Sequence, residues 1–445
     1  MYEKWYDEQI HIGKQVINNM KKLSMLTGLW SMLLIGFLSG CSGNQSASPS
    51  NPSPPVASAV PAPEASSEPS PSPSAPIVEK DAIRERIDKM TLEEKIGQMI
   101  IAGVHGTSAS AEDERMIKEQ HVGGIIFYKN NLADPDSVIR FTNQLKQWNE
   151  SHSVPLLLSV DQEGGRVSRL PGLDRLPNAQ EIGQWNSREA AGEIGAILGE
   201  EVSGMGMNMN FAPVLDIHNN PKNPVIGDRS FGSTAEIVSS MGIEVMKQMK
   251  QTGVIPVVKH FPGHGDTETD SHLDLPVIHK SEKDLTQLEW QPFVSAIEEG
   301  ADAVMVAHIL FPQIDEQYPS SLSPAVVTGQ LRDKLGFEGV ILTDDLTMGA
   351  IANRYGIGEA SVLSVQAGTD IVLIAHEYSN VDEVIDALKQ SVADGTLSEE
   401  RIDESVRRIL QLKTKFNLED KPVDPPDLTL LNERINKAID TYRIK

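Results

Sequence analysis

The chain has 445 residues and a formal net charge of −24. This acidic balance argues against nucleic acid or an anionic surface as a partner, because like charges repel. Cys41 is the only cysteine, which excludes a disulfide bond within one molecule.

Residues 1–41 are predicted to be an N-terminal extension followed by an export signal. Met20-Lys21-Lys22 supplies a short positive region, and the apolar, uncharged run 23–38 follows it. This order is typical of a secretory signal, with an uncleaved membrane anchor as the alternative. The ending Leu38-Ser-Gly-Cys41 resembles a bacterial lipoprotein processing site, which implies lipid on Cys41 and anchoring to the outer face of the cell membrane. Because residues 1–19 precede a complete signal, we expect Met20 rather than Met1 to be the true start.

The segment 42–76 consists mostly of Ser, Pro and Ala and has no aromatic residue. Such a composition buries too little apolar surface to offset the entropy of ordering, so we expect a disordered, extended tether. Residues 77–418 are long enough for one large α/β domain, and residues 419–445 are predicted to be a C-terminal tail rich in proline and charge. A tail of this kind leaves no room for a second domain.

A repeated strand and helix pattern fills residues 77–418. Thr91 to Glu94 fits a capping box and predicts a helix start. Segments Ala190–Met205 and Ile237–Thr252 suit crossover helices. Short apolar runs, predicted to be strands buried on both faces, are Gln98–Ala102, Gly124–Tyr128, Leu156–Val160, Met207–Phe211, Val254–Val258, Ala303–Ala307, Val340–Thr343 and Asp370–Ile374.

Eight such β-α units predict a single catalytic domain with the (β/α)8 fold, a TIM barrel. A doubly wound open sheet is the alternative, but no Gly-rich dinucleotide fingerprint follows the first run. Active sites of these barrels lie at the carboxyl ends of the strands. Ionisable residues follow four of the predicted strands and should converge there: Asp161, Lys259-His260, His308 and Asp344.

The segment Lys259–His272 places three histidines and several carboxylates on a loop broken by Pro and Gly. In an extended loop the side chains of Asp270 and His272 point the same way. A carboxylate bonded to one ring nitrogen raises the imidazole pKa and leaves the other nitrogen for acid/base work. The alternative is a surface loop whose histidine has no catalytic role.

A metal-binding site is a more specific alternative interpretation of this loop. However, His260 and His264 flank Phe-Pro-Gly, which breaks the helix that a His-x-x-x-His zinc pair needs. We therefore expect no metal.

Two further groups of residues belong to the predicted barrel mouth. Asp344 stands where a carboxylate can attack an anomeric carbon, although periodicity alone does not choose between Asp344 and Asp345. The loops 161–169 and 227–232 carry arginines suited to bidentate contacts with sugar hydroxyls. A salt-bridged network is the alternative, and we favour it for Glu163 and Arg166.

Five motifs together resemble glycoside hydrolase family 3, in its β-N-acetylhexosaminidase branch. They span the region from 80 to 415 in family order and are Asp161–Arg166, Gly227–Phe231, Lys259–Gly265, Asp270–His272 and Thr343–Met348. The resemblance implies a (β/α)8 barrel and a retaining mechanism without a cofactor. It makes Asp344 the nucleophile and His272 the general acid/base, oriented by Asp270. The positions that it implies for binding N-acetylglucosamine are Asp161, Arg169, Arg229, Lys259, His260 and His308.

From these features we expect a monomeric, exported, lipid-anchored exo-β-N-acetylglucosaminidase that acts on peptidoglycan fragments. The alternatives are another family 3 activity such as a β-glucosidase, and a non-catalytic glycan-binding lipoprotein. A phosphorylase is also possible in principle, because an imidazole acid/base does not repel an incoming phosphate as a carboxylate does.

Overall fold

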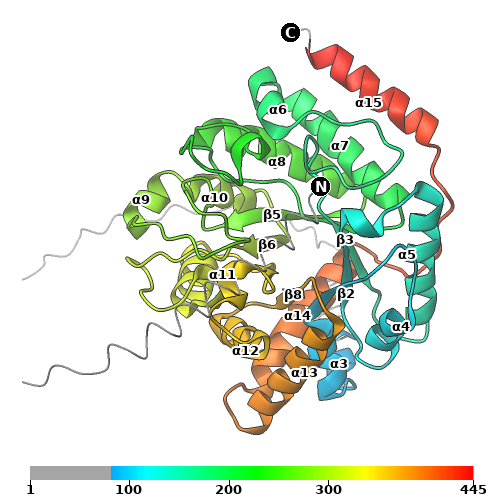
Figure 1. The fold of residues 1–445 in the computed structure, drawn as a ribbon, viewed down its shortest axis with the longest axis vertical. Helices are drawn as coiled ribbons and strands as arrows, with labels where there is room; N and C mark the ends of the chain where they lie inside the picture. The colour runs from blue at the N-terminus through cyan, green and yellow to red at the C-terminus, as the bar shows by residue number, and fades with distance from the viewer. Residues whose placement is uncertain (1–81, 444–445) are drawn as a thin grey trace, which may run out of the picture. The chain divides into compact units, whose positions relative to one another are not determined.

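The computed structural model describes residues 82–443, so the predicted export signal, Cys41 and the predicted linker 42–76 lie outside the described residues. Within this range eight parallel strands close into a barrel in chain order, with helices around it (Figure 1). The predicted (β/α)8 fold is confirmed. The strands are β1 Ile100–Gly103, β2 Gly124–Phe127, β3 Leu157–Val160, β4 Met209–Asn210, β5 Ile255–Phe261, β6 Ala303–Val306, β7 Val340–Asp345 and β8 Ile371–Ile374.

Helices and shorter helical turns connect the strands, after a first helix at 82–87. They are α3 Leu92–Gln98, α4 Ala111–Lys118, η1 Lys129–Asn131, α5 Pro135–Asn149, α6 Ala179–Trp185, α7 Arg188–Gly204, η2 Gly227–Arg229, α8 Ala235–Gln251, α9 Glu282–Gln287, α10 Gln291–Glu298, η3 Ser320–Leu322, η4 Ala325–Lys334, α11 Gly349–Ala352, α12 Ile357–Ala367, α13 Tyr378–Ala393, α14 Glu399–Lys415 and α15 Leu428–Arg443. Between residues 82 and 443, no helix combines the length and the apolar character needed to cross a membrane.

Local signals in the sequence fix several helix ends. Thr91 caps α3 through its side chain, which accepts from Glu94 N, while the Glu94 carboxylate accepts from Thr91 N, so the predicted capping box is confirmed. The two predicted crossover helices are present as α7 and α8.

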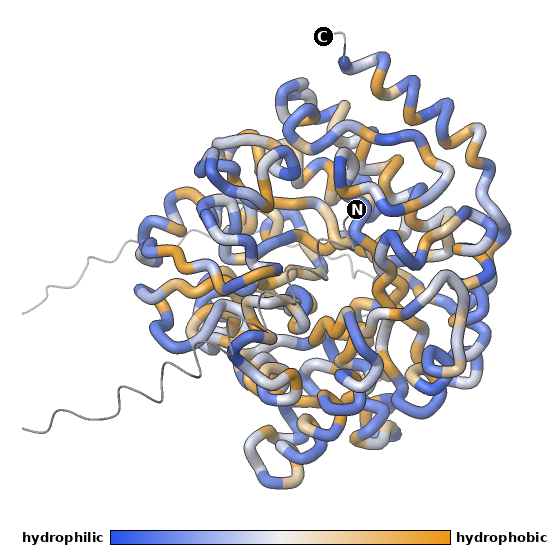
Figure 2. The backbone as a smooth tube through the Cα atoms, viewed as in Figure 1, coloured by the Kyte–Doolittle hydropathy of each residue, from blue (hydrophilic) through white to orange (hydrophobic). Residues whose placement is uncertain are grey.

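The core lies in and around the barrel, where the backbone tube is most hydrophobic (Figure 2). Almost every strand residue is buried, as near-continuous apolar runs predict for a parallel sheet covered on both faces. The barrel closes through pairing of β1 with β8, with Ile100 opposite Val372.

The predicted strands all differ from the observed ones, by up to three residues at an end. The first begins at Ile100, because Gln98 is the last residue of α3. The run at 207–211 forms a ladder only at Met209–Asn210. The side-chain amide of Asn208 adds two bonds to the backbone at the start of β3: Oδ1 accepts from Leu158 N and Nδ2 donates to Leu156 O.

Strand β5 is longer than predicted, and this corrects the placement of Lys259 and His260. Both lie inside the strand, not on the loop after it. The backbone supports the extension, because Leu215 N donates to Lys259 O at 2.6 Å and Lys259 N donates to Pro213 O at 3.2 Å. Polar side chains are tolerated in this buried strand because acidic residues from neighbouring strand ends pair with them.

The C-terminal segment 419–445 was predicted to be a tail, and this was wrong for most of its length. It contains the helix α15, which lies beside α6 and α7 (Figure 1). Ile435, Ala438 and Tyr442 recur at helical spacing and are buried. The Tyr442 ring packs on Trp185 at 5.9 Å between centroids.

Candidate active site

Asp344 lies at the mouth of the barrel, because it is the penultimate residue of β7 and the carboxyl ends of the strands form that mouth. Its Oδ1 accepts from Asp345 N at 2.8 Å. Burial acts to raise the pKa of Asp344, but the imidazoles of His260, His308 and His272 outweigh burial and lower it to about 2. The carboxylate is therefore ionised at neutral pH, as a nucleophile must be.

Asp345, the neighbour of Asp344, is held by a different set of contacts. Its carboxylate accepts from Thr347 N at 2.9 Å, from Thr347 Oγ1 at 2.6 Å and from Ala375 N at 3.1 Å. These bonds hold the turn after β7 against the end of β8. Asp345 is thus engaged by the turn and the end of β8 and does not cap the following helix α11.

Asp270 and His272 form a hydrogen-bonded dyad, and the prediction that they point the same way is confirmed. Asp270 Oδ1 lies 2.8 Å from His272 Nδ1 and also accepts from His272 N at 2.9 Å. Because a carboxylate only accepts, the proton of the neutral ring sits on Nδ1, and Nε2 is left for chemistry. The hydrogen bond that His272 Nδ1 donates to Asp270 raises the pKa of His272, against the effect of burial, and the charge of Asp344 adds to the rise.

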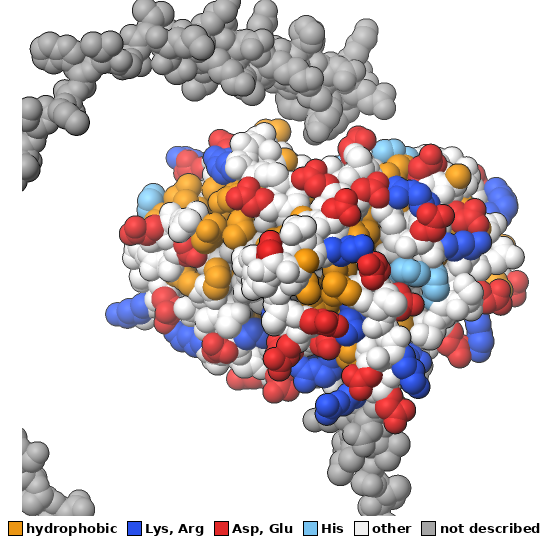
Figure 3. Space-filling model, turned by 90° about the horizontal axis from the view of Figure 1, so that it is seen from below, with side chains coloured by type: hydrophobic (Ala, Val, Ile, Leu, Met, Phe, Trp, Pro, Cys, Tyr) orange, Lys and Arg blue, Asp and Glu red, His pale blue; other side chains and the backbone are white. Residues whose placement is uncertain are grey.

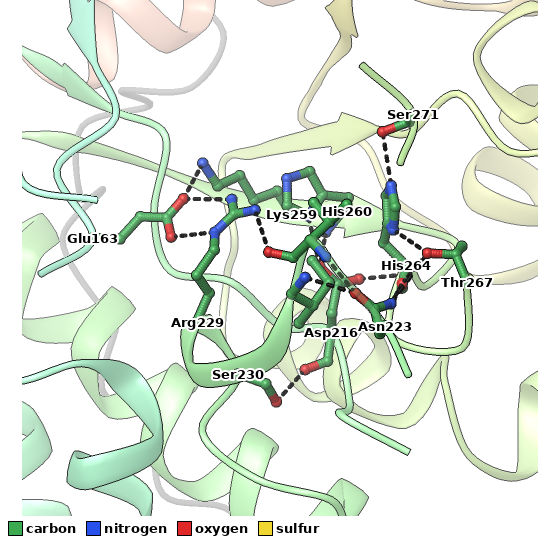
Figure 4. A network of polar contacts seen from close by, with 12 residues as sticks. Glu163, Asp216, Asn223, Arg229, Ser230, Lys259, His260, His264, Thr267 and Ser271 are labelled. Atoms are coloured by element: carbon green, nitrogen blue, oxygen red, sulfur yellow. Dashed lines mark hydrogen bonds and ion pairs between the residues drawn. The ribbon is translucent and has the colours of Figure 1, made fainter. Parts of the chain in front are cut away.

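A buried ion cluster joins Glu163, Lys259 and Arg229 (Figure 4). Lys259 Nζ lies 2.5 Å from Asp161 Oδ1 and 2.7 Å from Glu163 Oε1. Arg229 binds Glu163 through two parallel bonds of 2.7 and 2.8 Å. Burial acts to raise the pKa of Glu163, but Arg229 and Lys259 outweigh it and hold that pKa well below its ordinary range. The interpretation of Glu163 as part of a salt-bridged network is confirmed, and Arg166 likewise pairs with Asp228 at 2.7 Å.

The loop that carries Asp161 and Arg169 is held by a residue that the sequence did not single out. Gln162 Oε1 accepts from Arg169 N at 2.7 Å, and Gln162 Nε2 donates to Glu201 Oε2 on α7 at 2.7 Å. Burial raises the pKa of Glu201 to about 8, so this carboxyl is mostly protonated at pH 7. Among residues 82–443, Arg169 Nε is buried without a hydrogen-bond partner. The Arg169 guanidinium therefore has donor capacity for a ligand.

Asp216 is the most important residue that sequence reasoning missed. It is buried, its Oδ2 lies 2.6 Å from His260 Nδ1, and its Oδ1 accepts from His264 N at 2.6 Å (Figure 4). The acceptor carboxylate assigns the proton of a neutral His260 to Nδ1, so Nε2 remains available. The signal was a lone carboxylate in the apolar stretch after β4, a position typical of barrel sites.

His308 lies beside Asp344 with both ring nitrogens engaged. Nε2 is 2.9 Å from Asp345 O, and Nδ1 is 2.7 Å from Ser321 Oγ. Since a carbonyl only accepts, Nε2 carries the proton. Burial lowers the pKa of His308, which keeps it neutral. With both ring nitrogens bonded to protein atoms, His308 has no spare nitrogen for a ligand.

An aromatic pair stands at the same mouth. Tyr128 follows β2 and stacks on His376, which follows β8, with ring centroids 5.5 Å apart. The pKa of Tyr128 is raised by burial and by the charges of Asp345, Asp161 and Asp344. No group of three or more His, Cys, Asp or Glu side chains in the described part of the chain is arranged to hold a metal ion.

Known proteins resemble this chain across the barrel. Residues 91–412 match the glycosyl hydrolase family 3 N terminal domain. The β-hexosaminidase of Thiobacillus denitrificans is 36% identical over 293 residues, which cover 64% of this chain and 80% of the relative. A solved glycoside hydrolase family 3 β-N-acetylglucosaminidase from Paenibacillus sp. str. FPU-7 is 45% identical with a TM-score of 0.74, over 78% of this chain and 69% of that one. The structure of M. tuberculosis LpqI is 30% identical with a TM-score of 0.68, over 77% of this chain and 98% of that one.

Proposed function

Because the chain belongs to glycosyl hydrolase family 3 and is a β-N-acetylhexosaminidase, we propose that it removes terminal β-linked N-acetylglucosamine with retention, using Asp344 as nucleophile and His272 as acid/base. The observation that supports these roles is the Asp270–His272 hydrogen bond, which raises the pKa of His272 in a site where the pKa of Asp344 is low. His272 thereby keeps its proton to a higher pH than an ordinary histidine does, whereas Asp344 is ionised at neutral pH. This pairing is what a retaining glycosidase requires.

In the first step an oxygen of Asp344 attacks the anomeric carbon while the bond to the leaving oxygen breaks. The imidazolium of His272 gives its Nε2 proton to that oxygen, and Asp270 keeps the Nδ1 proton in place. The product is a covalent glycosyl ester on Asp344 and a neutral His272.

In the second step water attacks the same carbon and displaces Asp344. Neutral His272 Nε2 takes the proton of the water, which restores the imidazolium and the free carboxylate. Two displacements at one carbon give net retention.

The sugar ring is proposed to lie among Asp161, Arg169, Arg229, Lys259 and His260, with His308 behind it. The cluster provides N–H donors beside the Asp161 carboxylate, and sugar hydroxyls both donate and accept hydrogen bonds. The unpartnered Arg169 Nε adds a donor that a bound sugar can satisfy.

The natural substrate is proposed to be a peptidoglycan fragment, with the enzyme as a monomer on the outer face of the cell membrane. This rests on the lipoprotein-like ending at Cys41 and on the tether 42–76, which would place the barrel near wall glycan. Replacing Cys41 by Ser should move the protein from the membrane fraction to the soluble fraction. Retention of the variant in membranes would contradict the lipid anchor.

The test of activity compares p-nitrophenyl β-N-acetylglucosaminide with the matching β-glucoside, using the full chain and Asp344→Asn. We expect strong preference for the N-acetyl sugar and loss of turnover by on the order of 10³-fold or more in the variant, with sugar binding retained. Preference for the glucoside would point to another family 3 specificity. Full activity of Asp344→Asn would exclude it as the nucleophile.

Product analysis in phosphate buffer separates hydrolysis from phosphorolysis. Hydrolysis gives free N-acetylglucosamine at any phosphate concentration, whereas phosphorolysis gives the sugar 1-phosphate. We expect the free sugar.

A further inference from the structure

The segment 270–274, called the dyad loop below, is docked on the stretch that follows the nucleophile. The backbone N–H groups of Gly349 and Ala350 donate to His272 O and Ser271 O, each at 3.1 Å. Asn353 Nδ2 donates to Leu273 O at 3.1 Å. Three consecutive carbonyls of the dyad loop are therefore bound by residues that begin five positions after Asp344.

This docking depends on a glycine at position 349. A Cβ added to Gly349 would lie 2.5 Å from Leu273 O and 2.8 Å from His272 O, closer than real Cβ atoms approach other atoms. Both clashing atoms are backbone carbonyls of the dyad loop, so no side-chain rotation relieves them. Only glycine permits so close an approach of two backbones.

The dyad loop is also held at Ser271, by a buried histidine (Figure 4). His264 Nε2 lies 2.9 Å from Ser271 Oγ, and both residues are buried. His264 is fixed in turn by Asp216 through its backbone N and by Thr267 through Nδ1. A shift of the loop at Gly349 therefore cannot be absorbed at Ser271 and is passed to its neighbours, Asp270 and His272.

We propose that Gly349 is a positioning residue for the acid/base step. Because Gly349 has no side chain, the dyad loop can dock on the segment that follows Asp344. This docking sets the distance between His272 and Asp344. This inference rests on the proposed function, because it assigns to Gly349 an effect that acts through His272. General acid catalysis requires hydrogen-bond reach to the leaving oxygen, so a displacement of about 1 Å is costly, on the order of 10²-fold.

The test uses N-acetylglucosaminides whose leaving groups differ in their need for a proton, with the full chain. For Gly349→Ala we expect a loss in kcat/KM of roughly tenfold to a hundredfold with a poor leaving group such as 4-methylphenol. With 2,4-dinitrophenol, which departs without protonation, the loss should be less than about threefold. The matched control is Gly356→Ala, because its Cβ meets nothing closer than 3.8 Å, and it should leave both rates unchanged.

A double variant tests whether Gly349 acts through His272. In His272→Ala the acid is absent, so adding Gly349→Ala should cost nothing further with the poor leaving group. Asn353→Ala removes one loop contact without adding volume, and it should steepen the leaving-group dependence in the same direction by a smaller factor. This second variant gives a result even where Gly349→Ala folds poorly.

The outcomes separate the two proposals. If His272→Ala itself shows no leaving-group dependence, the acid/base assignment is wrong. If His272→Ala shows it but neither Gly349→Ala nor Asn353→Ala does, the positioning role is wrong. Equal losses for all leaving groups, or additive losses in the double variant, would also overturn the role of Gly349.

Discussion

His260 Nδ1 lies 2.6 Å from Oδ2 of the buried Asp216 carboxylate. The other oxygen of this carboxylate, Oδ1, accepts a hydrogen bond from His264 N, also at 2.6 Å. Burial acts to raise the pKa of Asp216, but His260 and His264 outweigh it and the pKa is lowered. One ionised carboxylate therefore orients a pocket imidazole and the anchor of the dyad loop. The two halves of the proposed site share a single support.

Replacing Asp216 by Asn should weaken both halves. The asparagine amide has one acceptor oxygen, and its NH2 group would face either His260 Nδ1 or His264 N, which are both donors. One of the two histidines therefore loses its hydrogen-bond partner. We expect a loss of about 1.5–3 kcal/mol in the free energy of unfolding, because these hydrogen bonds involve a charged group, and a fall in kcat/KM. Thermal denaturation and steady-state kinetics check this. An Asp216→Asn variant with unchanged stability and unchanged kinetics would contradict the shared support.

The pH dependence of kcat/KM should report the dyad. The pKa of His272 is raised above that of an ordinary histidine, so the protonated acid persists as pH rises and is lost only on passing through the raised pKa. Asp270→Asn removes the carboxylate whose hydrogen bond with His272 Nδ1 is the main cause of the rise, so the alkaline limb should move to lower pH. Activity lost in the variant should therefore be largest on the alkaline side.

A built-in control for this shift is a substrate that needs no acid. With a 2,4-dinitrophenyl leaving group the alkaline limb should be weak in both proteins. An alkaline limb at the same pH in Asp270→Asn and in the unaltered enzyme, measured with a poor leaving group, would show that Asp270 does not tune His272.

The barrel and the dyad were readable from the sequence because each depends on local information. Strands buried on both faces leave continuous apolar runs, and Asp270 and His272 are only two residues apart. The partners of His260 and Gly349 were not readable. Asp216 lies 44 positions from His260, and the docking of Gly349 on Leu273 joins different barrel connections. Such pairings arise only from the closed fold.

Two errors have similar physical reasons. A lysine and a histidine at 259 and 260 read as a loop, yet Asp161, Glu163 and Asp216 supply the charges that make them tolerable inside β5. The buried stripe of α15 is narrow, and prolines before it made the segment read as a tail. The composition of a segment does not show which other elements of the fold pack against it.

The ion cluster predicts a stability effect. Glu163→Gln would leave Arg229 and Lys259 with less compensating charge in a buried site, so we expect a loss of about 3–5 kcal/mol in the free energy of unfolding. The control is Asp228→Asn, whose pair with Arg166 has side chains 36% and 48% exposed and should contribute no more than about 1 kcal/mol. Chemical denaturation measures both.

The cluster should also make stability depend on pH. The folded-state pKa of Glu163 is depressed, so its contribution is present above the pKa of the unfolded chain, about 4.3, and is lost as pH falls below that value. The stability difference between the unaltered protein and Glu163→Gln should therefore shrink on acidification from pH 7 to pH 3. A difference that stays constant over this range would argue against an ionised Glu163.

Helix α15 touches the loop that leads away from the proposed sugar-binding residue Arg169. Asn432 accepts from Asp174 N at 2.8 Å through Oδ1 and donates to Gly172 O at 3.1 Å through Nδ2. The two bonds fasten the loop from outside the barrel, while Gln162 fastens it from inside by binding Arg169 N. The C-terminal helix is thereby part of the support of the proposed sugar site.

Asn432→Ala removes both outer bonds and should loosen the loop without touching the catalytic pair. Net loss of a hydrogen bond costs about 1 kcal/mol, so we expect KM to rise roughly threefold to tenfold while kcat changes by less than about twofold. Leu430→Ala is the matched control, because Leu430 lies on the same helix and is 64% exposed. Equal effects of the two substitutions would indicate general damage to α15. An unchanged KM in Asn432→Ala would mean that Gln162 alone is sufficient to hold Arg169, and that the outer contact serves only the packing of the helix.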